Sequence, residues 1–259
     1  TTYKGAEVAE FMSAIGYDAM AVGNHEFDDG PEGLAGFIDT VEFPLLSGNL
    51  DLSGSNLLKD KIKPYVVLET AGVKVGVISV LATDTAETSS PGPNVGFKDE
   101  AESLKAMVAA LEAEGVDKII ALTHVGFTRD KELAQIAGID AVIGGHSHTL
   151  FSNSEEGAEA YPTMVGAVPV VSAYAYSKYL GHLELAFDDA GQVTKAGGDP
   201  DNMPKTFDGL IELAAKIHAM DSKVAGMGYD INGWPDDWLW QALIFPQGGK
   251  LVDEETKTV

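Results

Sequence analysis

Apolar residues repeat at intervals of three and four residues in several segments of the chain. Four residues near the start share this spacing: Val8, Phe11, Met12 and Ile15. They predict an amphipathic helix over residues 5–15. Further helices are predicted over residues 34–41, 101–114 and 130–137.

Short apolar runs without this spacing predict strands between the helices. They occupy residues 18–22, 44–47, 65–70, 73–81, 118–122, 141–143, 168–173 and 179–187. The two runs that flank Ala71-Gly72 predict a hairpin. Because strands alternate with helices along most of the chain, the fold class predicted is α/β.

Polar residues follow three of the predicted strands at the point where each strand ends. Asn24 and His25 follow the first strand, His124 follows the strand at 118–122, and His146 and His148 follow the strand at 141–143. Open α/β sheets bind ligands at the carboxyl ends of their strands. We therefore expect the three segments to converge on one crevice.

The residue types at these strand ends suit a metal ion. Four of the six histidines lie there, and the chain has no cysteine, so thiolate sites and disulfides are excluded. Neutral imidazole and amide oxygen suit divalent zinc, manganese or cobalt. His146 and His148 are two residues apart, so in an extended loop they point opposite ways and can serve two adjacent metals. The alternative for each histidine taken singly is a structural role.

The net charge of −23 limits the partners of the chain. It argues against nucleic acid, which needs a basic surface, and against anionic membranes. No apolar run approaches about 18 residues, so no membrane span is predicted. A phosphate substrate would need local cations to attract it. The acidity itself fits either high solubility or a high-salt habitat.

Three segments resemble ordered motifs of the calcineurin-like metallophosphoesterases, in their 5'-nucleotidase branch. They are Gly23-Asn24-His25-Glu26-Phe27-Asp28, Thr123-His124 and Gly145-His146-Ser147-His148. Residues 3–8, 17–20, 43–47 and 173–181 fit the same branch, so the resemblance covers residues 1–197. It implies a four-layer αββα sandwich, a phosphate monoester such as a nucleotide as substrate, and a periplasmic or secreted location.

The resemblance also implies a role for each motif residue. Asn24, His124 and His146 would hold one metal, and His148 would belong to a second. His25 would stabilise the phosphate charge and protonate the leaving oxygen, while Asp28 would orient His25.

The chain departs from the family pattern at its start. The family opens with Asp-x-His and then Gly-Asp, but no Asp-x-His occurs here, and Gly-Asp occurs only at residues 198–199. We therefore expect an incomplete sandwich, about one divalent metal per chain and impaired phosphomonoesterase activity. The alternative is a non-catalytic metal-binding or structural relic.

The end of the chain resembles a different family. Residues from about 195 onward are similar to part of a periplasmic sugar-binding protein of the ABC-transporter type. The predicted boundary separates a phosphoesterase-like domain, residues 1–197, from a short α/β appendage, residues 198–259. Trp234, Trp238 and Trp240 are expected to pack against the main domain or a second subunit, which would make the protein a homo-oligomer. A sugar-binding module is the third functional alternative.

Overall fold

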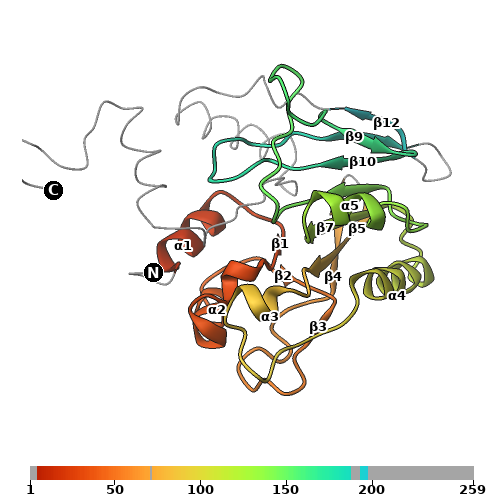
Figure 1. Cartoon of the computed structure of the whole chain (residues 1–259). Coiled ribbons are helices and arrows are strands. Elements are labelled where there is room, and N and C mark those ends of the chain that lie inside the picture. Colours follow the sequence, from red (N-terminus) through yellow and green to blue (C-terminus); the bar gives the residue numbers. More distant parts are fainter. Residues whose placement is uncertain (1–4, 71, 188–192, 198–259) are drawn as a thin grey trace, which may run out of the picture.

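A six-stranded mixed sheet forms the centre of the computed structural model, which describes residues 5–70, 72–187 and 193–197 (Figure 1). Its strands, in spatial order, are β4 (Tyr65–Thr70), β5 (Val73–Leu81), β7 (Ile119–His124), β8 (Ala141–Ile143), β10 (Val168–Val171) and β9 (Thr163–Val165). The four central strands are parallel, and β4 and β9 run antiparallel at the two edges. The predicted hairpin of β4 and β5 and the predicted α/β fold class are confirmed.

Helix α4 (Glu100–Ala113) buries one side against this sheet, and α5 (Phe127–Leu133) follows β7. Leu104 and Leu111 of α4 are fully buried with Ile78 and Ile119 of the sheet. Asp99 caps the start of α4, because its side chain accepts a hydrogen bond from the Glu102 amide. Burial of these aliphatic side chains anchors β5 and β7, whose carboxyl ends lie side by side.

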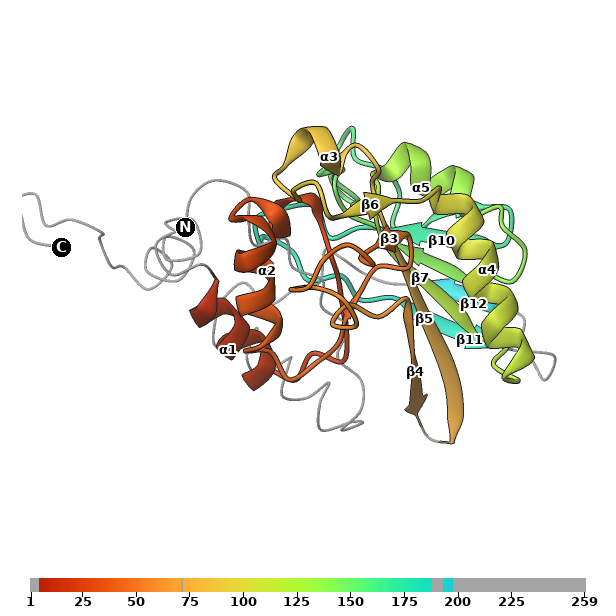
Figure 2. The same cartoon turned by 90° about the horizontal axis from the view of Figure 1, so that it is seen from below.

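A second apolar cluster contains residues of most of the smaller elements. These are α1 (Ala6–Ala14), β1 (Met20–Ala21), the 3-10 helix η1 (Asn24–Phe27), α2 (Gly30–Ile38), β2 (Leu45–Leu46), β3 (Leu50–Asp51) and β6 (Gly96–Phe97). The short helix α3 (Thr85–Thr88) follows β5. Strands β1 and β2 pair in parallel, and β3 pairs antiparallel with β6. Figures 1 and 2 show α1 and α2 at one end of the molecule and α4 at the other, with β4, β5 and β7 between them. A hairpin of β11 (Glu184–Phe187) and β12 (Val193–Gly197) completes the described elements.

Several predicted boundaries are wrong. Helix α5 begins three residues before the predicted start at 130, because the Ser147 hydroxyl from another loop accepts the Phe127 amide hydrogen. Helix α2 begins at Gly30 and not at residue 34, since Pro31 suits a first helical turn and extends the helix backward. The strand predicted over residues 179–187 is confined to β11, and the predicted strand over 168–173 ends at Val171.

Two further expectations concern whole segments of the chain. No helix among the described residues is long and apolar enough to cross a membrane. Residues 198–259, with the three tryptophans and the predicted appendage, lie outside the described residues. The domain boundary at residue 197 therefore stays a prediction.

Candidate functional site

The three polar segments lie at one edge of the molecule's β-structure. Asn24 opens η1, which two residues separate from the end of β1, and His124 is the last residue of β7. His146 lies in the loop after β8, which pairs in parallel with β7. Because β1 also packs beside β7, the carboxyl ends of all three strands meet there.

The side chain of Asn24 joins the other two segments. Its Oδ1 lies 3.0 Å from His124 Nε2 and 3.2 Å from His146 Nδ1, and the two imidazole rings meet edge to face with their centroids 5.2 Å apart. Asn24 and His124 are buried, with 4% and 8% of their surface exposed. Each ring can donate an N–H to the amide oxygen, so the three side chains face a common point.

This arrangement fits a divalent metal ion. Two ligand atoms bound tetrahedrally at about 2.1 Å from one zinc ion lie about 3.4 Å apart, close to the separations between Asn24 Oδ1 and the two imidazole nitrogens. Two imidazoles and an amide oxygen suit a borderline ion. Within the described part of the chain, no three His, Cys, Asp or Glu side chains group closely enough to hold a metal. A metal here would therefore depend on the Asn24 amide as its third protein ligand.

A glycine allows His124 to reach this position. A Cβ on Gly23 would lie 2.8 Å from His124 Cε1 and 2.7 Å from Glu26 Oε2, which is closer than real Cβ contacts allow. The Gly23 amide instead donates to the Glu26 carboxylate, which closes the turn from β1 into η1. Close packing at Gly23 thus brings the side chains of Asn24 and His124 into contact.

A buried carboxylate that we did not predict lies behind the site. Asp130 of α5 is 2% exposed, and its Oδ1 accepts a hydrogen bond of 2.6 Å from Thr123 Oγ1. Burial raises the pKa of Asp130 to about 7, and the hydrogen bond from Thr123 opposes that rise. Asp130 Oδ2 lies 2.1 Å from the place a Gly144 Cβ would take, so only glycine fits there. Asp130 therefore lies between the residue before His124 and the loop that carries His146.

A second unpredicted carboxylate faces His146 from the end of β5. Asp84 Oδ2 lies 3.9 Å from His146 Nε2, on the ring nitrogen that does not contact Asn24. Asp84 is half exposed and follows the carboxyl end of β5. The same strand-end pattern that indicated His124 would have indicated Asp84.

His25 and Asp28 form a pair on the outer side of η1. His25 Nδ1 lies 2.8 Å from Asp28 Oδ2, and the two side chains are 34% and 42% exposed. The other carboxylate oxygen of Asp28 accepts a hydrogen bond of 2.7 Å from Ser89 Oγ. Ser89 comes from the segment after α3 and was not predicted. Asp28 thus forms hydrogen bonds with both His25 and Ser89. His25 itself follows Asn24 directly in the chain.

His148 has a different neighbour from the other histidines. Its ring meets the Tyr176 ring edge to face, with centroids 5.1 Å apart. The structure therefore groups Asn24, His124 and His146, and sets His148 against the loop after β10.

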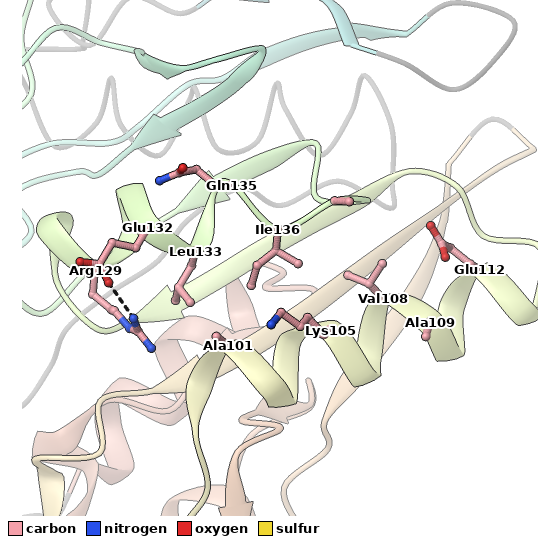
Figure 3. Close-up of a pocket in the computed structure, with 11 residues that line it drawn as sticks. Ala101, Lys105, Val108, Ala109, Glu112, Arg129, Glu132, Leu133, Gln135 and Ile136 are labelled. Carbon is pink, nitrogen blue, oxygen red and sulfur yellow. Dashed lines mark hydrogen bonds and ion pairs between the residues drawn. The ribbon is translucent and has the colours of Figure 1, made fainter.

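A groove of about 550 Å³ lies elsewhere, between α4 and α5 (Figure 3). Val108, Leu133 and Ile136 line its floor, and none of the candidate site residues lines it. Arg129 at its edge pairs with Glu132 at 2.6 Å and with Glu100 at 3.1 Å. The groove is therefore separate from the histidine cluster.

Known proteins resemble the chain in sequence and in fold. Residues 3–154 match the family described as bacterial capsule synthesis protein PGA_cap. A 5'-nucleotidase of Diplobatis ommata is 42% identical over 246 residues, which cover 89% of this chain and 42% of that protein. The human 5'-nucleotidase is 44% identical over 214 residues, covering 77% of this chain and 37% of that protein. The chain thus spans less than half the length of these relatives.

Solved structures show the same relationship. A 5'-nucleotidase precursor of Thermus thermophilus superimposes with a TM-score of 0.74 at 37% identity, over 85% of this chain and 46% of that one. The calcineurin-like phosphoesterase YfkN of Bacillus subtilis gives a TM-score of 0.63 at 28% identity, over 83% and 73% of the two chains. The 89% share matched by the Diplobatis protein is larger than residues 1–197 alone, so that similarity continues past residue 197. The expected sugar-binding resemblance has no support in these matches.

Proposed function

Since the chain belongs to the family described as bacterial capsule synthesis protein PGA_cap and has the fold of the 5'-nucleotidase-like, calcineurin-like metallophosphoesterases, we propose that it hydrolyses a phosphate monoester with the help of a divalent metal. The family description names capsule synthesis, whereas the relatives are named 5'-nucleotidases. We follow the relatives because their identity is high over most of the chain. The substrate proposed is therefore a nucleotide or a similar monoester, and the location proposed is periplasmic or secreted.

One observation carries the proposal: Asn24 Oδ1 lies within 3.2 Å of a ring nitrogen of both His124 and His146. These three residues would hold the metal. A divalent ion held there would supply Lewis-acid polarisation of the phosphoryl oxygens. Asp84 would place a negative charge beside His146 and favour a ring orientation that suits binding.

His25 would act on the phosphate directly. It is part exposed and adjacent to Asn24, so its ring can reach a group held near the metal ligands. Asp28 accepts the Nδ1 hydrogen of His25, so in the protonated ring the Nε2–H would supply the proton to the leaving oxygen. Ser89 restrains Asp28 and so keeps this ring orientation.

A non-catalytic metal-binding role is the second candidate. The described residues contain no cluster of three His, Cys, Asp or Glu side chains that could hold a metal. The ring of His148, which is proposed for a second metal, packs on Tyr176. We therefore expect about one bound metal per chain.

Metal content and hydrolysis distinguish the two candidates. The chain is dialysed against zinc or manganese and measured by elemental analysis, and hydrolysis of p-nitrophenyl phosphate and AMP is followed with and without a chelator. The proposal predicts bound metal and chelator-sensitive hydrolysis, both lost in His124→Ala. His182→Ala is the matched control, because His182 lies beside Glu184 and has no assigned role. Bound metal without any hydrolysis would favour the non-catalytic role.

A further inference from the structure

Two loops beside the site contain most of the left-handed backbone outside glycine. In the described part of the chain, six non-glycine residues have positive φ, and five of them lie in these loops. They are His146 (77°), His148 (49°), Tyr174 (65°), Tyr176 (59°) and Ser177 (53°). Such conformations are strained for residues with a Cβ, and they gather where a structure clamps a ligand. The loop over residues 174–178 is therefore a candidate ligand contact.

Aromatic contacts fix the shape of this loop. Tyr176 packs edge to face on His148, and it remains 41% exposed. Tyr174 packs in the same manner on Tyr179, with centroids 5.9 Å apart. The loop therefore carries two oriented rings, one of them in contact with a histidine proposed for the site.

Lys178 places its ammonium over both rings. Its Nζ lies 5.6 Å from the Tyr174 centroid and 5.5 Å from the Tyr176 centroid, within the range of a cation–π contact. The ammonium forms no ion pair with any residue that the structure describes. The two ring faces attract the Lys178 ammonium without accepting hydrogen bonds from it. Its N–H groups therefore remain available to an anion.

The net charge of the chain gives a positively charged side chain a role beside the proposed metal. At a net charge of −23, a phosphate dianion is attracted only by local positive groups. Arginine is the usual residue for this task, but the single arginine of the chain, Arg129, is engaged by Asp99, Glu100 and Glu132. Lys178, in contrast, contacts the ring of Tyr176, which packs on the ring of His148.

We propose that Lys178, held over Tyr174 and Tyr176, forms an anion subsite that takes the phosphate group of a monoester substrate. The choice of a monoester rests on the proposed function. The subsite itself rests on the ring contacts and the unneutralised ammonium. It supplies binding and orientation, and no bond is made or broken by Lys178.

Binding of inorganic phosphate tests the subsite without turnover. Calorimetric titration compares the unmodified chain with Lys178→Gln, which removes the charge and keeps most of the length of the side chain. We expect Lys178→Gln to weaken phosphate binding about tenfold. Lys178→Arg should retain binding within about threefold, because it keeps the charge. Lys74→Gln is the matched control, since Lys74 is exposed and lies roughly 20 Å along β5 from the carboxyl end of that strand.

A second measurement checks that the effect is electrostatic. Phosphate binding should weaken between about 50 mM and about 500 mM NaCl in the unmodified chain, and less steeply in Lys178→Gln. Equal phosphate affinity of Lys178→Gln and the unmodified chain would overturn the subsite, and so would a chain that binds no phosphate. If all variants bind as expected but none hydrolyses a monoester, the proposed function fails and the subsite stands.

Discussion

Asn24 Oδ1 lies 3.0 Å from His124 Nε2, although the two residues are 100 positions apart in the chain. Asn24 comes from the short helix after β1, and His124 ends a strand of the central sheet. His146 approaches the same oxygen from a third segment, at 3.2 Å. The metal-binding proposal depends on these two separations.

Removal of the Asn24 amide should abolish tight metal binding. Asn24→Ala leaves two imidazoles, which hold a divalent ion poorly against water, so metal affinity should fall by at least about 100-fold. Competition with a chromogenic chelator measures the change. Asn56→Ala is the matched control, because Asn56 is an exposed asparagine. Unchanged affinity in Asn24→Ala would remove Asn24 from the ligand set.

Removal of the His25 ring should lower turnover without releasing metal. If His25 serves as the proton donor, His25→Ala should reduce kcat by about 10²–10⁴ while elemental analysis gives the same metal content. Asp28→Asn should reduce kcat less, because the ring stays in place but loses its charged partner at 2.8 Å. Loss of metal from His25→Ala would instead identify His25 as a ligand.

Replacement of Gly144 should destabilise the fold. A Cβ at this position would lie 2.1 Å from Asp130 Oδ2, so Gly144→Ala forces the buried carboxylate or the loop to move. We expect a loss of about 1–3 kcal/mol in the free energy of unfolding, measured by urea denaturation. Gly36→Ala in α2 is the control, since nothing lies within 4 Å of its Cβ position. That change should be neutral or stabilise the protein by about 0.5–1 kcal/mol, as expected for glycine in a helix.

Asp130 should make stability depend on pH. Burial raises its folded-state pKa to about 7 from 3.8, so the unfolded chain releases this proton at lower pH than the folded chain. The contribution of Asp130 to the free energy of unfolding is therefore largest below pH 3.8. It falls as the pH rises toward 7, by up to about 4 kcal/mol.

Asp130→Asn provides the comparison for this effect. The asparagine does not titrate, so the stability of Asp130→Asn relative to the unmodified chain should increase as pH rises from the unfolded pKa of 3.8 to about 7, and then level off. Urea denaturation of the two metal-free proteins across this range measures it. Other carboxyls whose pKa is raised, such as the partly buried Asp140, titrate in both proteins and cancel in the difference. A difference that stays constant with pH would show that Asp130 ionises normally in the fold.

The sequence by itself indicated the α/β class, the hairpin of β4 and β5, and the strand ends that carry Asn24, His124 and His146. These features depend on local spacing: side-chain period distinguishes strand from helix, and parallel strands end at a shared edge. Residue roles and the domain boundary at residue 197 remain predictions.

Only the tertiary structure revealed the partners of these residues. Ser89 reaches Asp28 across 61 positions of the chain, and Asp84 reaches His146 from the segment after β5. Asp130 meets Thr123 only because α5 folds back over the end of β7. The start of α5 likewise depends on Ser147, twenty positions along the chain. Local periodicity carries no information on which loops meet across a sheet, because that depends on how whole elements pack against one another.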